Sequence, residues 1–229
     1  MQQSSWPCEM YHTARLLALN WAALATHPDI LFAMSTVACF SSNPGPAHWE
    51  AMKWIFCYLS GTQDLWLTYS EKSQGLVGYI NADGSMGEHC KAISGITFLI
   101  NGGVISWSSK KQEIVSLLMT ESEYVAATHG MQEALWLHSI ITEFFQPYNK
   151  PVDLFCDSQS AIALTRDHQY HSCMKHIDAQ YHFIRWVVEE GCVCLIYCPT
   201  QDMVANVFTK ALPSTKAKHF ADCLRLWPI

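Results

Sequence analysis

Charged residues are scarce in this chain. Asp, Glu, Lys and Arg together make up 15% of its 229 residues, whereas soluble domains carry roughly 25%. The formal net charge is −6, which excludes a generic polyanion binder, so any contact with nucleic acid has to use a local basic patch. Half of the residues are hydrophobic, and a chain of this length can therefore bury a substantial core.

Signals for membranes and secretion are absent as well. No apolar run reaches the roughly 18 residues that a membrane span needs. The first residues include Pro7 and Glu9 without a basic stretch, so we expect no signal peptide. The ten cysteines form no Cys-x-x-Cys pair, and several lie in apolar runs, as buried free thiols do. These features predict an intracellular protein, in the cytoplasm or nucleus, with no membrane partner.

One short stretch has the residue types of a zinc site. Three histidines and a cysteine lie close together at His168, His171, Cys173 and His176. A second ligand pair at the spacing of a zinc finger is missing. The sequence therefore disfavours zinc at this stretch.

Three helices are expected before residue 62. Apolar residues recur at helical spacing over residues 11–26, 30–40 and 49–61, and a turn rich in Pro and Gly separates the last two. Their large apolar side chains are too many for a solvated appendage; they include Leu16, Leu17, Trp21, Trp54, Phe56 and Leu59. We predict that this helical unit packs against the first strands of the next region.

From residue 65 onward strands and helices alternate. The apolar patterns predict strands at residues 65–69, 75–82, 93–100, 104–108, 152–156 and 192–198. They predict helices at residues 120–145, directly after 157, at 176–190 and over 201–224 with a break at Pro213. Asn101-Gly102 is a strong hairpin signal. The predicted fold class is α/β: a mixed sheet of three antiparallel strands followed by parallel strands, with flanking helices.

Acidic and amide side chains stand at the ends of these elements. Asp157 ends a buried strand, where ligands bind in α/β folds, although an isolated Asp-Ser pair is also a common helix cap. Asn81 and Asp83 share one face of a strand. Glu123 lies in the first turn of the long helix, where it is also a plain partner of the helix dipole. Asn206 lies in the last helical segment. Carboxylates that converge in this way bind two Mg²⁺ ions for phosphodiester cleavage, and we expect Glu123 to point at Asp157.

Several longer motifs carry a family resemblance. They are Asn81-Ala82-Asp83-Gly84-Ser85, Ile105-Ser106-Trp107-Ser108-Ser109-Lys110-Lys111-Gln112, Thr120-Glu121-Ser122-Glu123-Tyr124, Cys156-Asp157-Ser158-Gln159-Ser160-Ala161, Lys175-His176-Ile177-Asp178 and Phe208-Thr209-Lys210-Ala211-Leu212-Pro213. Through them residues 75–220 resemble the ribonuclease H domain of copia-type retrotransposon polyproteins. Residues 11–70 resemble the segment between reverse transcriptase and ribonuclease H, through Ala25-Thr26-His27-Pro28-Asp29-Ile30 and the stretch from Asn43 to Trp49.

The resemblance implies a ribonuclease H-like fold and cleavage of RNA in RNA–DNA hybrids with two Mg²⁺ ions. It divides the chain into a helical remnant of reverse transcriptase, residues 1–70, and a ribonuclease H-like domain, residues 71–229. It implies that the metal ligands are Asp83, Glu123 and Asp157. The candidate phosphate contacts are Lys110, Lys111, Lys175, His176 and Lys210, with a solvated basic rim as the alternative interpretation. The implied partners are the hybrid and the reverse transcriptase part of the same polyprotein.

Two positions depart from the family pattern. The family usually has Asp where this chain has Asn81 and Asn206, and the context of Asp83 also resembles a first catalytic aspartate. Either Asn81 or Asp83 therefore takes the first-acid role. Each Asn removes a negative charge that holds Mg²⁺. Three interpretations follow: an impaired nuclease, a hybrid-binding module without catalysis, or a decayed fragment without function. Because Asn→Asp is nearly isosteric, we expect reversal to leave the packing unchanged, with the larger gain from Asn206→Asp.

Overall fold

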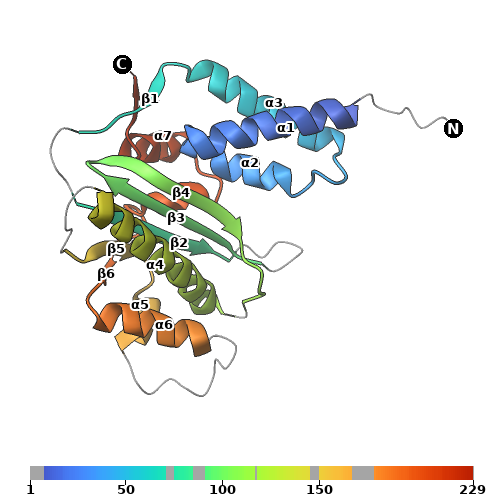
Figure 1. Ribbon diagram of the computed structural model, residues 1–229. Helices are drawn as coiled ribbons and strands as arrows, with labels where there is room; N and C mark the ends of the chain where they lie inside the picture. The colour runs from blue at the N-terminus through green and yellow to red at the C-terminus, as the bar shows by residue number, and fades with distance from the viewer. Residues whose placement is uncertain are drawn as a thin grey trace.

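The computed structural model describes residues 8–70, 75–84, 91–116, 118–144, 150–166 and 178–228. Its centre is a five-stranded mixed sheet in the order β4-β3-β2-β5-β6 (Figure 1). The strands are β2 (Val77–Asp83), β3 (Ile93–Ile100), β4 (Gly103–Lys111), β5 (Val152–Cys156) and β6 (Val193–Tyr197). β2, β3 and β4 are antiparallel, whereas β5 runs parallel to β2 and β6 parallel to β5. The predicted fold class, a ribonuclease H-like mixed sheet with flanking helices, is confirmed.

A long helix, α4 (Met119–Phe144), covers one face of this sheet (Figure 1). It approaches β2 closely at Gly130, where an added Cβ would lie 2.4 Å from Cγ2 of Ile80. The shorter helices α5 (Gln159–Arg166) and α6 (Asp178–Glu189) complete the layer. The core between the helices and the sheet includes Ile80, Phe98, Tyr124, Met131, Leu154 and Ile184. The first turn of α4 is thereby fixed over the end of β2.

The N-terminal helices lie against β4 and the C-terminal part of the chain. They are α1 (Cys8–Ala25), the 3₁₀ helix η1 (Pro28–Ile30), α2 (Leu31–Ala38) and α3 (Pro46–Gly61). Their buried side chains form one cluster with residues of β4, of the 3₁₀ helix η3 (Val204–Phe208) and of α7 (Ser214–Cys223). The Trp107 indole donates to the Ala23 carbonyl at 2.7 Å. The helices are thus joined to the sheet by a shared core and by hydrogen bonds.

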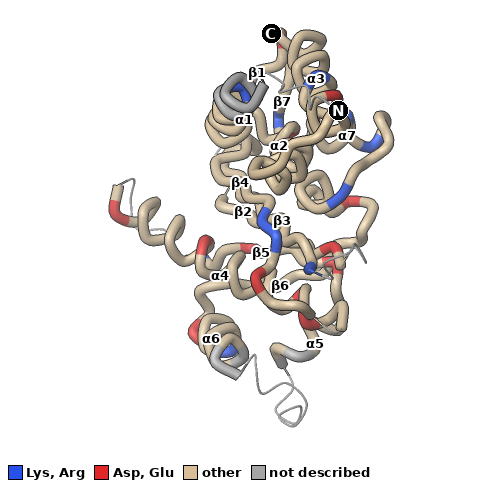
Figure 2. Tube along the Cα trace, turned by 90° about the vertical axis from the view of Figure 1, so that its right-hand side faces the viewer, with Lys and Arg blue, Asp and Glu red and all other residues tan. Residues whose placement is uncertain are grey.

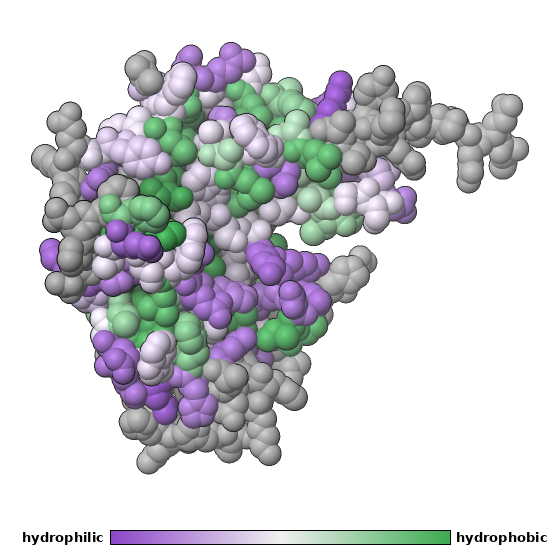
Figure 3. All heavy atoms as spheres, viewed as in Figure 1, coloured by the Kyte–Doolittle hydropathy of each residue, from purple (hydrophilic) through white to green (hydrophobic). Residues whose placement is uncertain are grey.

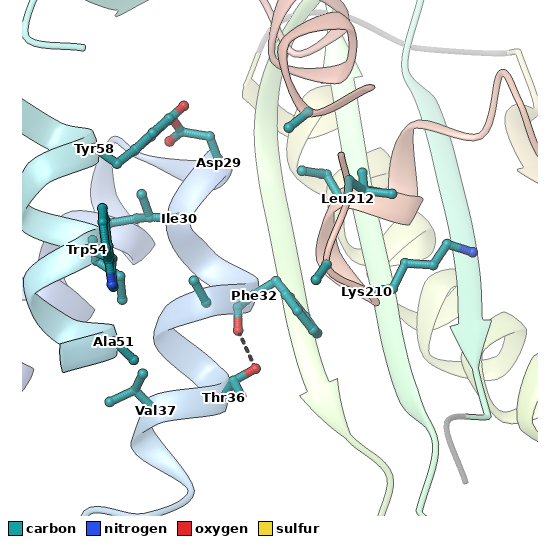
Figure 4. A pocket seen from close by; sticks show the side chains of 15 residues that line it. Asp29, Ile30, Phe32, Thr36, Val37, Ala51, Trp54, Tyr58, Lys210 and Leu212 are labelled. Carbon is teal, nitrogen blue, oxygen red and sulfur yellow. Dashed lines mark hydrogen bonds between the residues drawn. The ribbon is translucent and has the colours of Figure 1, made fainter. Parts of the chain in front are cut away.

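Part of the apolar surface of these helices stays exposed, as Figure 3 shows over the upper part of the molecule. Leu16 is buried, but Leu17 is 63% exposed, and Trp21 and Trp54 are each 73% exposed. An apolar cavity of about 500 Å³ separates α2 and α3 from residues 207–217. Figure 4 shows the Lys210 side chain extending away from the helical wall of this cavity.

Two predicted elements differ from the structure. The strand expected at residues 65–69 is β1 (Leu65–Leu67), which pairs outside the main sheet with an unexpected strand, β7 (Leu226–Pro228). The helical segment expected over residues 201–224 is the short 3₁₀ helix η3 followed by α7, so Asn206 lies on 3₁₀ rather than α-helical backbone. Both differences arise from contacts between distant segments, which local patterns do not contain. Within the described residues, no helix has the length and hydropathy of a membrane span.

Gly95 on β3 is predicted to control how closely η3 approaches the sheet. A Cβ at this position would lie 2.6 Å from Cγ2 of Thr209 and 2.7 Å from the carbonyl oxygen of Ala205. Gly95→Ala should therefore push η3 outward and lower the free energy of unfolding by about 1–3 kcal/mol in urea titrations. Gly61→Ala is the matched control, because nothing lies within 4 Å of its Cβ position. Equal stabilities of the two variants would contradict the close packing of η3.

Candidate functional site

Two asparagines face each other where β2 meets η3. Asn81 Nδ2 donates to Asn206 Oδ1 at 2.9 Å and to the Thr209 hydroxyl at 2.9 Å. Asn206 Nδ2 donates in turn to the Thr200 carbonyl at 2.7 Å. Both asparagines are only 2% exposed. The structure therefore brings together the two positions at which the chain departs from the family pattern.

The chemistry of the partners fixes the orientation of both amides. The Thr200 carbonyl can only accept, so the amide nitrogen of Asn206 has to face it. The oxygen of Asn206 is then left to face Asn81, whose amide nitrogen has to be the donor. A carboxylate at either position would place two acceptors against each other. The exchange to Asp conserves the shape on which the expected packing depends, but it removes a hydrogen-bond donor from the pair.

A second group of polar side chains lies beside this pair. Ligand atoms of Glu123, Cys156 and Asp157 all lie within 4.8 Å of one another. Glu123 comes from the first turns of α4, whereas Cys156 and Asp157 come from the end of β5. The Thr200 hydroxyl donates to Asp157 Oδ2 at 3.0 Å. The expected approach of Glu123 to Asp157 is confirmed, and Thr200 connects this group to the asparagine pair.

The Glu123 carboxyl is poised for protonation. Burial and the nearby Asp157 charge raise its pKa to about 8, with a smaller contribution from Asp83, against the opposing effects of the Ala82 backbone N–H and of Lys210. The Oε2 atom of Glu123 is buried and has no hydrogen-bond partner in the described part of the chain. Such an atom is costly unless a proton or a cation satisfies it.

Cys156 has a different character. Burial raises the pKa of its thiol to about 12, so the thiol is protonated at neutral pH. A protonated thiol is a poor ligand for a hard cation such as Mg²⁺, which binds oxygen. The oxygen atoms of the group that could hold such a cation therefore belong to Glu123 and Asp157.

The predicted basic contacts are spread over the molecule. Lys110 and Lys111 are exposed at the end of β4, and Lys110 lies 3.8 Å from Glu113. Lys210 is half-buried and close enough to lower the pKa of Glu123. Figure 2 shows basic and acidic positions interspersed around the ends of β3, β5 and β6. Lys175 and His176, like the stretch disfavoured as a zinc site, lie outside the described residues.

Sequence reasoning missed the residues that connect these groups. Thr200 follows β6 in a turn and belongs to none of the quoted motifs. Thr209 and Cys156 stand inside quoted motifs, but nothing in the sequence pattern assigned them a contact. Asp83 lies at the end of β2, and its negative charge helps to raise the pKa of Glu123. Within the described residues, Asp83 is not part of the group formed by Glu123, Cys156 and Asp157.

The chain is similar to several curated polyproteins, although no protein-family model matches it. The retrovirus-related Pol polyprotein from transposon TNT 1-94 of Nicotiana tabacum is 40% identical over 201 residues, covering 87% of this chain and 15% of that one. The corresponding polyprotein from transposon RE1 of Arabidopsis thaliana is 34% identical over 199 residues, covering 86% and 14%. The chain belongs to the ribonuclease H region of copia-type retrotransposon Pol polyproteins. This copia-type region spans about 15% of the length of the relatives.

A solved structure supports the fold. A foamy viral protease-reverse transcriptase, dRH, in complex with double-stranded DNA matches with a TM-score of 0.53 and 16% identity, covering 88% of this chain and 32% of that one. Identity at this level shows a shared fold and carries no information about activity. The match extends over more of the copia-type region than the five-stranded sheet and α4 alone.

The pKa of Glu123 predicts how stability depends on pH. A carboxyl with a raised pKa binds more protons when folded, so the free energy of unfolding falls as pH rises from about 4.5 to about 8. Glu123→Gln removes this titration. In metal-free urea titrations, the variant should gain on the order of 2–4 kcal/mol over the parent between pH 4.5 and pH 8. Glu143→Gln, at an exposed position of α4, is the control; an equal gain there would contradict the assignment.

Proposed function

We propose that this copia-type domain binds RNA–DNA hybrids and is strongly impaired as a magnesium-dependent nuclease, because amides stand where two acids are needed. The hydrogen bond from Asn81 to Asn206 at 2.9 Å is the observation that carries the proposal. The direct contact of Asn81 with Asn206 supports Asn81, rather than Asp83, as the residue in the first-acid position. The second acid position is Asn206, with Glu123 and Asp157 retained.

The remaining acids fit one divalent cation. Glu123 and Asp157 would hold it, because their oxygens are close together and Glu123 Oε2 lacks a partner in the described structure. A cation bound there would supply Lewis-acid stabilisation of the phosphate and activation of a water. The amide pair provides no charge for a second ion. Lys210 offsets part of the acid repulsion, and its positive charge near the acids supports it as a contact for a phosphate oxygen.

The proposal retains the expected division of the chain and its partners. Residues 1–70 are a helical remnant of reverse transcriptase, and residues 71–229 are the ribonuclease H-like domain. The two parts share one buried apolar cluster. Lys110, Lys111, Lys175, His176 and Lys210 are the proposed hybrid contacts. The reverse transcriptase part of the polyprotein is the proposed partner, inside the cell.

Binding without cleavage is the second candidate. Lys110 and Lys111 remain exposed at the sheet edge irrespective of the amide pair, so loss of the acids does not remove them. When binding depends on phosphate contacts, the logarithm of the binding constant falls linearly with the logarithm of the salt concentration. A chain that binds hybrid in a salt-dependent way but does not cleave it would be a binding module. A chain that neither binds nor cleaves hybrid would be a decayed fragment.

Restoring both acids should restore cleavage. Asn81→Asp together with Asn206→Asp should cut the RNA strand of a hybrid about 100-fold faster or more than the parent chain in Mg²⁺, because removal of catalytic groups costs orders of magnitude. Each single variant should gain much less, since one acid alone faces an unmatched acceptor. The measurement is the initial rate on a labelled hybrid.

Two controls keep this result interpretable. The double variant with Asp157→Asn added should lose the recovered rate, which excludes a contaminating nuclease. Asn43→Asp, an exposed exchange in the turn before α3, should leave the rate of the parent unchanged. A folded double variant that binds hybrid but stays inactive would contradict the charge argument.

A further inference from the structure

Thr200 lies between the two groups of the site and touches both. Its hydroxyl donates to Asp157 Oδ2 at 3.0 Å, and its carbonyl accepts from Asn206 Nδ2 at 2.7 Å. Thr200 stands in the turn between β6 and η3, where the Asp202 N–H donates to the Pro199 carbonyl at 2.9 Å. One residue therefore ties the end of β5 to the 3₁₀ helix through its side chain and its backbone.

We propose that Thr200 is a positioning residue that holds the Asp157 carboxylate in the orientation needed for a divalent cation. This role rests on the proposed function, because it concerns the same cation site. The hydroxyl occupies one oxygen of Asp157 and limits rotation of the side chain. Asp157 is only half-buried, so rotation toward solvent is otherwise open to it. Partners of this kind orient the residues that bind a metal.

The backbone contact makes the arrangement specific. The hydrogen bond between the Thr200 carbonyl and Asn206 holds the turn against η3. It thereby fixes the position of the Thr200 hydroxyl relative to Asp157 at the end of β5. The side-chain and main-chain contacts can be separated by mutation. Thr200→Val removes the hydroxyl and keeps the shape and the carbonyl, whereas Thr200→Ser keeps all three polar atoms.

The test combines magnesium titration of the full chain with crystal structures of the variants. Thr200→Val should weaken Mg²⁺ binding about 10-fold, at the lower end of the 10–100-fold cost of such partners. Thr200→Ser should stay within about 2-fold of the parent. Thr62→Val removes an exposed hydroxyl that donates to the Tyr58 carbonyl at the end of α3 and is the matched control. In Thr200→Val crystals the Asp157 carboxylate should adopt a different rotamer.

Each outcome decides the role of Thr200. Unchanged Mg²⁺ affinity in Thr200→Val, or an Asp157 carboxylate that keeps its place, would overturn it. An equal loss in Thr200→Ser would show that shape rather than the hydroxyl matters and would overturn it as well. If the parent chain binds no Mg²⁺, the proposed cation site fails. The rotamer of Asp157 then decides alone: a rotated carboxylate in Thr200→Val supports positioning by Thr200, and an unmoved one refutes it.

Discussion

The buried contact between Asn81 and Asn206 constrains the rest of the site. Each side chain is 2% exposed, and the two are joined across 2.9 Å. In a space closed to water, two carboxylates at this distance would repel strongly unless a cation lay between or beside them. Two amides satisfy each other without a cation. Two acids at this distance would therefore need a cation, whereas two amides are stable here without one.

This contact depends on packing far from the polar atoms. Asn206 reaches the sheet because η3 lies directly on Gly95, and η3 is held there by the apolar cluster that includes the N-terminal helices. Glu123 reaches the site because α4 packs closely on β2 at Gly130. The helical unit, the sheet and the C-terminal segment therefore position the polar groups jointly, although those groups come from β2, α4, β5 and η3.

The sequence predicted the parts of this arrangement that depend on local pattern. Alternating strands and the Asn101-Gly102 turn predicted the β3–β4 hairpin, in which Asn101 and Gly102 both have positive φ. The family roles of Glu123 and Asp157, together with their expected place at one end of the sheet, correctly predicted that the two side chains lie close together. Pairing of β1 with β7 and the bonds made by Thr200 join residues far apart in the chain, and periodicity carries no information about such contacts. The donor role of each amide also needed the structure, because it follows from the Thr200 carbonyl.

The central claim is that the amide pair replaces a metal-balanced acid pair, and thermal unfolding with and without Mg²⁺ tests it most directly. In EDTA, the Asn81→Asp, Asn206→Asp double variant should melt on the order of 5 °C or more below the parent, because two acceptors lose their donors. Saturating Mg²⁺ should reverse most of this loss, since a ligand bound to the folded state at about 100 times its Kd stabilises by roughly 2.7 kcal/mol. At the same Mg²⁺ concentration the parent should gain much less, because its site has two fewer carboxylates and therefore a higher Kd for the ion. A double variant as stable as the parent in EDTA, or a parent that gains as much from Mg²⁺, would contradict the account.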